Sequence, residues 1–298
     1  MHRAPLPPPL ARSSFGVPEA RAAGIARSRT RAADLASPRR GVRVPIELDA
    51  SAEQRVAPLL GGDRWFSHVS AARLWGCPLP PGLPAEAHVT ARGRAPRIAG
   101  VRGHSTLARP SLRLRRGLPV TDAAATFLAL AELLPFDELV VCGDHLVHDP
   151  PKLDPAEPER PHKTIARIEQ RARGHCGRGA RAARRALDLL STGAESRPET
   201  LLRLLLLRAG LTGFVVNPDV SDARGRWLAR CDLVFFDRMV VVEYDGDRHR
   251  TSRERYEQDQ RRIERLTDAG WRVIRIRSDA LFRRPEEVVR RVSSALAR

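Results

Sequence analysis

Carboxylate side chains border two apolar runs near the carboxyl end of the chain. Asp232 precedes the run 233–236, and Glu243 follows the run 239–242. The short turn at 237–238 predicts that the two runs are antiparallel strands, in which facing residues have numbers that sum to about 475. Asp232 and Glu243 satisfy that sum, so we expect them to be cross-strand neighbours on one face.

Carboxylates arranged in this way need a cation. Glu243 and Asp245 share a face because side chains alternate along a strand, and Asp232 would lie beside them. Like charges at the end of a buried strand repel one another, and a divalent metal ion is the usual compensation. The sequence therefore predicts that a divalent metal ion is held where Asp232, Glu243 and Asp245 converge at one edge of the sheet.

The elements that would position these groups are helices and strands in alternation. The segment Ser196–Glu199 has the residues of a helix start. The run 239–242 is apolar enough for a strand buried on both faces, and residues 271–277 alternate as a strand does. The expected order is α-β-β-β-α-β-α, with helix 196–210, strands 217–222, 227–236 and 239–242, helix 252–269, strand 271–277 and helix 286–296.

Each of these residues also has a purely structural interpretation, which the sequence leaves open. Glu199 can complete a capping box with Ser196. Asp232 can simply pair with Arg230 or Arg275. Asp245-Gly246 can be only a turn, and His249 can be only the start of a helix. Asp259 can form salt bridges with Arg255 and Arg262 on one helix.

Composition divides the chain into segments. A stretch with five prolines is the clearest linker, and glycines interrupt the basic helical stretch that follows it. The predicted segments are a disordered tail at 1–12, a reduced helix-turn-helix-like segment at 13–50, an α+β domain at 51–148, a Pro-rich linker at 149–162, a basic helical segment at 163–190 and a C-terminal α/β domain at 191–298.

The segment 13–50 has the outline of a reduced winged helix. One helix would cover residues 17–25 and end near Gly24, a second would run from 28 to 35, and residues 37–44 would turn into a strand. The alternative is a small helical adaptor with solvated arginines. In the next segment, residues 65–76 predict a helix with an aromatic and aliphatic face.

Histidines and cysteines form no recognisable metal motif. His68, His88 and His104 have no cysteine or carboxylate at ligand spacing, so ordinary structural histidines are the simpler interpretation, with a metal site as the alternative. The four cysteines form no CxxC pair, which argues against a disulfide framework and a zinc ribbon.

The chain is strongly basic. It has 52 Lys+Arg against 35 Asp+Glu and a formal net charge of +17, which attracts polyanions and above all nucleic acid. Part of the arginine content can reflect a GC-rich genome. Arg171, Arg173 and Arg181 in the basic segment are expected to hold phosphates, and a solvated helical hairpin is the alternative. With neither a membrane span nor a signal peptide in the sequence, we expect a cytoplasmic protein that contacts DNA and no membrane.

Residues 195–298 resemble a known protein family. The carrying residues are Ser196-x-x-Glu199, Arg230–Leu233, Val240–Gly246, His249, Asp259 and Ala269–Val273. This text is similar to restriction-endonuclease-like proteins of a family of unknown function, related to very-short-patch-repair endonucleases. The order α-β-β-β-α-β is also that of the PD-(D/E)XK nuclease superfamily.

The resemblance implies particular roles. A helix glutamate, a strand aspartate and the acid of the E-x-K element bind Mg²⁺ in that superfamily, and the matching positions are Glu199, Asp232 and Glu243. The lysine of E-x-K is Asp245 here. Its substitutes would be His249, Arg248 or Arg275, and His249 would act as a general acid or base near neutral pH. The very-short-patch-repair relatives also lack the lysine and use histidine. The resemblance thus implies catalysis by Asp232, Glu243, Asp245 and His249 with Mg²⁺ or Mn²⁺.

The upstream region is similar to AbiEi-type antitoxins. The matching residues are the short helix-turn-helix-like start, Arg40–Val42, His68-x-x-Ala71-Ala72-x-Leu74–Gly76, His88–Thr90 and Gly117–Thr121. In that family the start reads promoter DNA.

Two functions therefore compete. The first is a metal-dependent endonuclease that hydrolyses DNA in defence or repair, with backbone contacts from Arg171, Arg173, Arg181, Arg248 and Arg275. The second is a non-catalytic, antitoxin-like DNA-binding regulator on a degenerate nuclease fold. A third interpretation is that the arginine content is genomic drift and the partner is a protein, which the sequence does not identify.

Overall fold

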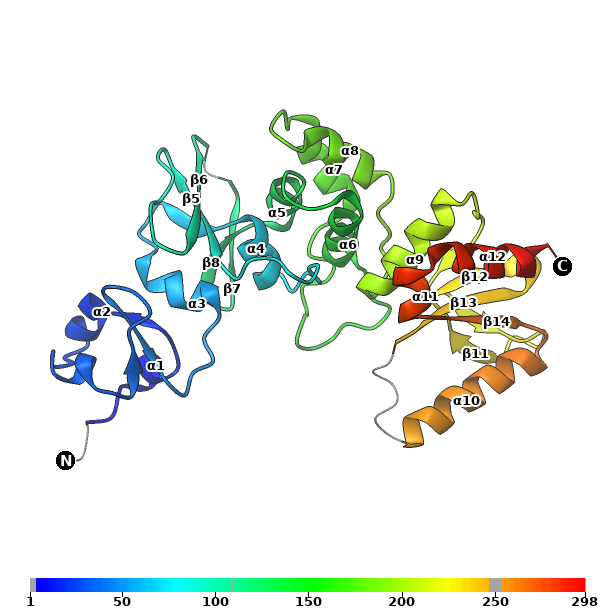
Figure 1. Ribbon diagram of the computed structural model, residues 1–298, viewed down its shortest axis with the longest axis horizontal. Coiled ribbons are helices and arrows are strands. Elements are labelled where there is room, and N and C mark those ends of the chain that lie inside the picture. The colour runs from blue at the N-terminus through cyan, green and yellow to red at the C-terminus, as the bar shows by residue number, and fades with distance from the viewer. Residues whose placement is uncertain (1–3, 109, 247–252, 298) are drawn as a thin grey trace. The chain divides into compact units, whose positions relative to one another are not determined.

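The computed structural model describes residues 4–108, 110–246 and 253–297, with the backbone alone for residues 253–256 (Figure 1). The chain forms two compact units. Unit 1 comprises residues 1–133 and 175–179, and unit 2 comprises residues 134–174 and 180–298. Both units are mixed α/β. Among the described residues, no helix has the length and apolar character needed to cross a membrane.

The amino-terminal part of unit 1 is a small sheet with short helices. Its strands pair in the order β1-β3-β2, and Leu10, Phe15 and Ala20 are buried in its core. Residues 8–11, which the sequence assigned to a disordered tail, form a helix because Leu10 packs against Phe15. The elements are α1 (Pro8–Ala11), β1 (Phe15–Gly16), α2 (Val17–Ala22), η1 (Arg29–Arg31), β2 (Leu35–Ala36) and β3 (Val42–Pro45).

The second helix of the expected winged helix is missing. A single 3₁₀ turn, η1, stands in its place, and the chain then continues as strand β2. The Thr30 hydroxyl donates to the carbonyl oxygen of Arg27 at 2.9 Å, and Arg29 forms a salt bridge with Asp34 at 2.8 Å. These local bonds close the turn without helix propagation.

The rest of unit 1 is built around a five-stranded mixed sheet of order β6-β5-β4-β8-β7. The predicted helix at 65–76 starts later than expected, because Trp65 and Phe66 are buried as part of strand β4. The elements are α3 (Ala52–Val56), η2 (Ala57–Leu59), β4 (Arg64–Phe66), α4 (His68–Leu74), β5 (Ala87–Arg92), β6 (Val101–Thr106), β7 (Leu112–Arg115), β8 (Leu118–Thr121) and α5 (Ala123–Leu130).

Unit 2 begins with three helices, α6 (Phe136–Val147), α7 (Ile165–Arg173) and α8 (Ala180–Leu187), which pack on one another. The interruption of the basic helical stretch lies between α7 and α8, as the glycines predicted. Gly179 has a φ of +78°, and a Cβ atom there would lie 2.4 Å from the carbonyl carbon of Ala131. Only glycine fits this position.

The carboxyl-terminal part of unit 2 contains a four-stranded sheet of order β14-β13-β12-β9 and a separate hairpin, β10-β11. Pairs such as Leu233↔Val242 and Phe235↔Val240 have numbers that sum to 475, so the predicted register is confirmed. The elements are α9 (Arg197–Arg208), β9 (Val215–Val216), β10 (Asp219–Ser221), β11 (Trp227–Arg230), β12 (Leu233–Phe235), η3 (Phe236–Arg238), β13 (Val240–Asp245), α10 (Arg253–Asp268), β14 (Arg272–Arg277), α11 (Ser278–Arg283) and α12 (Pro285–Leu296).

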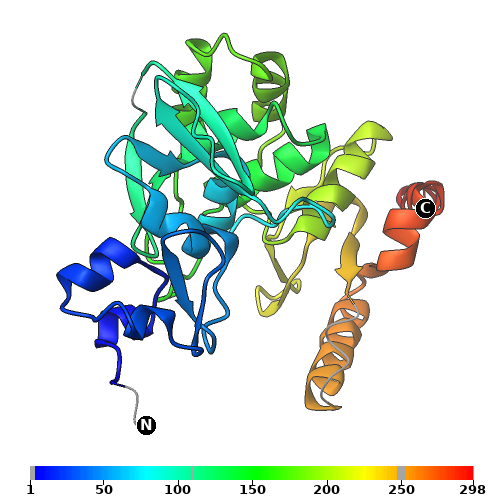
Figure 2. The same cartoon turned by 60° about the vertical axis from the view of Figure 1, so that its left-hand side comes forward.

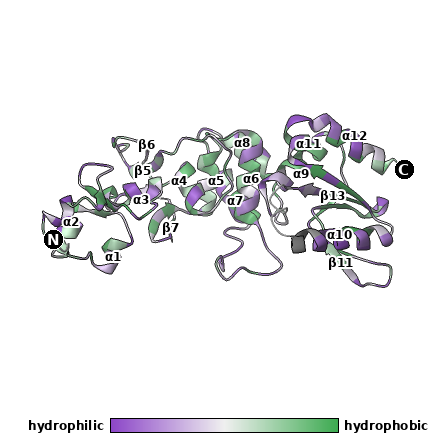
Figure 3. Cartoon of the chain, turned by 60° about the horizontal axis from the view of Figure 1, so that its bottom comes forward, coloured by the Kyte–Doolittle hydropathy of each residue, from purple (hydrophilic) through white to green (hydrophobic). Residues whose placement is uncertain are grey.

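Helices cover both faces of this sheet. Val240 and Val242 pack with residues of α9 and α12 on one face, whereas Val241 packs with Leu266 of α10 on the other. Figures 1 and 2 show α9 and α12 on one side of β13 and the orange helix α10 on the opposite side. Residues of α10 are mostly hydrophilic (Figure 3), so its sheet-facing side is narrow. Glu243, two residues after Val241, therefore belongs to the α10 face.

The strand expected over 227–236 is two strands, β11 and β12, which belong to different sheets. The chain breaks between them at Cys231-Asp232. Opposite this break, Asn217 adopts a left-handed backbone with a φ of +47°, and its N–H donates to the carbonyl oxygen of Asp232 at 2.8 Å. The break places Asp232 at the start of β12 rather than inside a continuous strand.

Candidate active site

Asp232 has a strongly perturbed environment in unit 2. Its Oδ2 atom accepts a hydrogen bond of 2.7 Å from the N–H of Tyr244. Burial, and after it the negative charges of Glu199 and Glu243, raise the pKa of Asp232 to about 8 against the opposing effects of the Tyr244 N–H and of Arg262. The surroundings of Asp232 therefore disfavour its ionised form.

Glu243 is 4% exposed and is held by an arginine of α10. Arg262 donates from Nη1 to Oε1 at 2.5 Å and from Nη2 to Oε2 at 2.7 Å, a bidentate geometry. Although burial opposes it, these hydrogen bonds and the charges of Glu243 and Asp259 raise the pKa of Arg262. Glu243 therefore has a fixed cationic partner.

The ion pairs continue from Arg262 along the face of the sheet. Asp259 accepts from Arg262 at 2.9 Å, which confirms the salt bridge predicted between these two residues, and it also lies 2.9 Å from Arg275. Arg275 in turn lies 3.1 Å from Asp245, and Arg277 lies 3.7 Å from Asp245. Asp245 is thus engaged by arginines of β14, and its carboxylate is not part of the environment that perturbs Asp232.

Glu199 lies in the first turn of α9 and acts on Asp232. Its carboxylate accepts hydrogen bonds from the Ser196 hydroxyl at 2.7 Å, the Glu195 N–H at 3.0 Å and the Asn217 side-chain amide at 2.8 Å. The Ser196 hydroxyl caps α9 by accepting from the Glu199 N–H at 3.4 Å, but the predicted capping box is not formed, because Glu199 accepts from the N–H of Glu195 and not from that of Ser196. At the same time, Glu199 contributes the largest charge repulsion on Asp232.

The salt bridges that could have explained Asp232 do not occur. Arg230 pairs with Glu195 at 2.9 Å, and Arg275 pairs with acids of β13 and α10. Among the described residues, Asp232 has no ion-pair partner. Arg248 and His249, which the sequence placed near this site, lie outside the described residues.

The acids Glu199, Asp232 and Glu243 are close enough to perturb one another but do not form a tight ligand set. Across the described residues, one group of three His, Cys, Asp or Glu side chains has ligand atoms within 4.8 Å of one another, and it is the histidine group His68, His88 and His104 in unit 1. The acids remain apart because other partners hold them: Tyr244 for Asp232, Arg262 for Glu243 and Asn217 for Glu199.

A metal ion nevertheless fits at Asp232. Mg²⁺ is commonly held by one or two carboxylates, with waters and substrate phosphate completing its shell. A cation there would offset the repulsion among the acids that raises the pKa of Asp232. Glu199 is the second carboxylate whose charge acts most strongly on this position. Glu243 could join only if it shares its oxygens with Arg262.

The arginines predicted to hold nucleic acid fall into two classes. Arg171 and Arg173 are on the exposed side of α7 and Arg181 is on the exposed side of α8, while Ala172 and Ala183 face inward. Arg275 is instead held by Asp245 and Asp259, so its guanidinium already has anionic partners.

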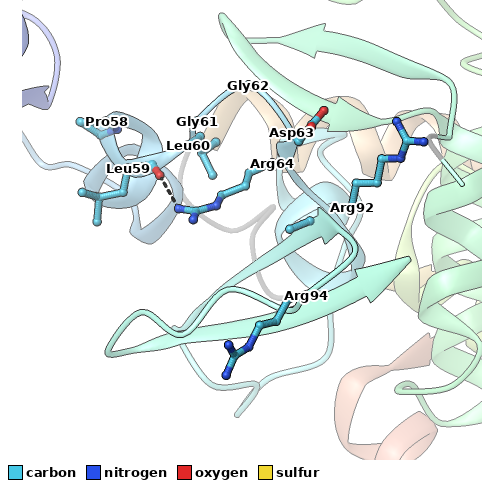
Figure 4. Close-up of a pocket in the computed structure, with 10 residues that line it drawn as sticks. Pro58, Leu59, Leu60, Gly61, Gly62, Asp63, Arg64, Arg92 and Arg94 are labelled. Carbon is cyan, nitrogen blue, oxygen red and sulfur yellow. Dashed lines mark hydrogen bonds between the residues drawn. The ribbon is translucent and has the colours of Figure 1, made fainter. Parts of the chain in front are cut away.

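Sequence reasoning missed a basic pocket in unit 1. Arg64, Arg92 and Arg94 line a pocket of about 560 Å³, and the only acid in its wall among the described residues is Asp63 (Figure 4). Arg64 donates to the carbonyl oxygen of Leu59 at 3.1 Å, and all three arginines are exposed. Such a surface attracts phosphate.

Arg262 was also missed as a partner of Glu243. Its spacing to Asp259 predicted only a local salt bridge, because residues three apart share a helix face. Nothing in the spacing told which strand residue that helix face would meet.

Comparison with known proteins identifies the carboxyl-terminal part of the chain. Residues 212–296 match the model of the restriction-endonuclease-like family REase_MTES_1575. The match supports a restriction-endonuclease-like domain in this part of the chain. The match covers Asp232, Glu243 and Arg262, starts after Glu199, and indicates a nuclease-type function with DNA as the substrate class. A search of curated proteins found no match. Neither comparison supports the link to very-short-patch-repair enzymes or to AbiEi antitoxins, which stay predictions.

Proposed function

We propose that unit 2 is a metal-dependent endonuclease that hydrolyses DNA phosphodiester bonds. The observation that carries this proposal is Asp232, a largely buried acid beside Glu199 and Glu243 without an ion-pair partner among the described residues. The family match at 212–296 supports the same assignment. The elements from α9 to β14 follow the order α9-β9-β10-β11-β12-β13-α10-β14, and the α-β-β-β-α-β order of a PD-(D/E)XK core remains part of the proposal.

The proposed site assigns a role to each acid. Asp232 is the main ligand of a Mg²⁺ or Mn²⁺ ion, and Glu199 and Glu243 supply further negative charge to it. When bound, such an ion polarises the scissile phosphate and lowers the pKa of a water molecule. Arg262 orients Glu243 by its two hydrogen bonds. Asp245 sets the positions of Arg275 and Arg277 at the carboxyl end of β13.

The positive charge of unit 2 suits the same substrate. Arg171, Arg173 and Arg181 project from the exposed sides of α7 and α8. Guanidinium groups on helix surfaces hold the phosphate backbone and carry no sequence information. We therefore assign them to sequence-independent DNA contact.

One observation favours a second candidate, a non-catalytic DNA-binding protein on a degenerate nuclease fold. Arg262 engages both oxygens of Glu243, the acid that matches the metal ligand of the nuclease motif. A guanidinium at this place can substitute for the charge of a metal ion. Under this second function the domain keeps the fold and binds DNA without cutting it.

Cleavage of plasmid and single-stranded DNA by the full chain with Mg²⁺ or Mn²⁺ tests the first proposal. Asp232→Asn and Glu243→Gln remove charge with little change in size. Asp188→Asn, at an exposed acid of the same unit, is the matched control. We expect cutting by the control, a loss of about 10²-fold or more for both site variants, and no cutting in a chelator. Tight DNA binding with no cutting by the unmodified chain would instead select the second candidate.

The salt dependence of DNA affinity tests the assigned contacts. Arg171→Ala, Arg173→Ala and Arg181→Ala should each lower the slope of log K against log salt concentration by about 1, and affinity should fall about equally for unrelated sequences. An unchanged slope in all three variants would exclude these arginines from the DNA interface.

A further inference from the structure

Three histidines that are far apart in the sequence meet in unit 1. His68 is the first residue of α4, His88 lies in β5 and His104 lies in β6. The parallel register of β5 and β6 pairs Thr90 with His104, which puts His88 and His104 on the same face as diagonal neighbours. His68 stacks on His104 with ring centroids 3.6 Å apart and an interplanar angle of 15°.

The nitrogen atoms of this cluster have the spacing of metal ligands. The Nε2 atom of His104 lies 3.1 Å from the Nδ1 atom of His88, and one nitrogen from each ring lies within 4.8 Å of the others. Two imidazole nitrogens on one tetrahedral Zn²⁺ ion, each bound at about 2.1 Å, are separated by about 3.4 Å. For His68 and His104 to direct a nitrogen at the same ion, one of them would have to turn out of their nearly parallel stack, because the lone pair of an imidazole nitrogen lies in the plane of its ring.

We propose that His68, His88 and His104 form a Zn²⁺ site in unit 1, separate from the acidic site of unit 2. Three histidines are a common protein set for zinc, with the fourth position open to water or another ligand. The ion would tie α4 to the parallel pair β5 and β6.

The surroundings of His68 are those of an oriented metal ligand. Its Nδ1 atom lies 2.8 Å from the Ser67 hydroxyl, which lies 2.6 Å from the Thr90 hydroxyl, and its Nε2 atom lies 3.0 Å from Oε1 of Glu132. Whichever nitrogen takes the ion, a hydroxyl or a carboxylate holds the other. Carboxylate and hydroxyl partners of this kind fix the ring and tautomer of ligating histidines.

Backbone geometry gives independent support. His68 has a φ of +50°, in the left-handed region that costs free energy for a residue with a side chain. That conformation starts α4 with the imidazole aimed at His104. Strained conformations of this kind concentrate at functional sites.

The charges around the cluster favour uncharged rings. Burial, followed by the neighbouring rings and Arg102, lowers the pKa of His68 and of His88 to about 3. Burial and Arg102 lower the pKa of His104 to about 4. Arg102 is the cation that opposes a metal ion; its side chain is 53% exposed and lies 3.9 Å from Glu86. Glu132 supplies the compensating negative charge beside His68.

The test is Zn²⁺ and Co²⁺ binding to the full chain after removal of metal by a chelator. Calorimetry gives stoichiometry and affinity, and the visible spectrum of Co²⁺ reports nitrogen ligation in a tetrahedral site. His104→Phe keeps the aromatic stack on His68 but removes the ligand atoms. His148→Phe is the control, because it removes a histidine of unit 2 whose Nδ1 atom forms a hydrogen bond of 3.0 Å with the Thr192 carbonyl oxygen at the surface.

We expect one ion per chain at the three histidines, besides any ion that the acids of unit 2 hold. His104→Phe should weaken binding by about 100-fold or more, Glu132→Gln should weaken it by about 10-fold, and His148→Phe should have no effect. Zinc should also raise the melting temperature of the unmodified chain but not of His104→Phe.

Absence of saturable binding would overturn the proposal and leave a hydrogen-bonded histidine cluster. Unchanged affinity in His104→Phe would also overturn it, because the ion would then bind elsewhere. If His104→Phe does not fold, the proposal is still tested by the zinc affinity of Glu132→Gln and by the Co²⁺ spectrum of the unmodified chain. Asp232→Asn should remove any ion held by the acids of unit 2 and leave zinc binding at the histidines unchanged, so failure of the nuclease proposal is seen separately.

Discussion

Replacement of Asp232 by Asn probes the acid at the centre of the proposed active site. Asn keeps the size of the side chain and an oxygen that can accept from the Tyr244 N–H, but it has no charge for Glu199 and Glu243 to repel. The pKa of Asp232 is raised from 3.8 to about 8 in the folded chain. Near neutral pH the folded chain therefore carries this acid protonated, and the unfolded chain carries it ionised.

The sign of the effect follows from that difference. The folded state binds one proton more than the unfolded state between the two pKa values, so stability is greatest below the unfolded pKa and falls as pH rises toward the folded pKa. One proton corresponds to about 1.4 kcal/mol per pH unit, which gives about 3 kcal/mol between about pH 5 and pH 7.5. Asp232→Asn does not lose this stability, so its free energy of unfolding relative to that of the unmodified chain should rise by about 3 kcal/mol between about pH 5 and pH 7.5.

The assay must report on the sheet of unit 2 and not on unit 1. Hydrogen exchange of the backbone amides of Val234 and Val241, measured by NMR in a chelator, gives the free energy of opening of β12 and β13 at each pH. Asp188→Asn provides the same chemical change at an exposed position.

Two results would refute the reasoning. Parallel pH dependences of the unmodified chain and of Asp232→Asn would mean that Asp232 ionises at an ordinary pKa. A loss of stability in Asp232→Asn at every pH would mean that the carboxylate stabilises the fold.

The other predictions concern buried ion pairs of unit 2. Arg262→Leu should destabilise the sheet by about 3–5 kcal/mol because Glu243 is left buried without its partner, and the double variant with Glu243→Leu should recover most of this loss in the same exchange experiment. Arg203→Leu should cost a similar amount, because Asp144 is buried and accepts from Arg203 at 2.8 Å. Burial already raises the pKa of Asp144 against the opposing charge of Arg203, so the loss of stability in Arg203→Leu should shrink as pH falls and Asp144 takes up a proton. Unfolding in guanidinium chloride at several pH values measures this loss. An equal loss at every pH would contradict the prediction.

Much of unit 2 could be predicted because its patterns are local. The apolar run before Glu243 predicted a strand buried on both faces. The position of the turn predicted the register of β12 against β13, which the pairs from Leu233↔Val242 to Phe235↔Val240 confirm, although the connection covers residues 236–239 instead of two residues. The interruption between α7 and α8 followed from glycines. These features depend on neighbouring residues, so the periods of strands and turns are sufficient to find them.

Other features depended on contacts that no local pattern encodes. The run 227–236 satisfied the composition of one strand, yet it divides at Asp232 because each half pairs with a different partner strand. The expected second helix of the winged-helix segment is replaced by a 3₁₀ turn that side-chain hydrogen bonds close. Local propensity was overridden in both cases by pairing and hydrogen bonding.

The sequence by itself determined which residues could do chemistry and where each lies along its strand, because side-chain alternation and charge are properties of the chain. Only the tertiary structure decided which cation meets which acid: the α10 face carrying Arg262 lies over Glu243, and Asp232 is left beside two like charges. It also brought together His68, His88 and His104, since the pairing of β5 with β6 and the start of α4 join residues that no spacing connects. Helix and strand packing sets such distances between elements, and a sequence period extends only within one element.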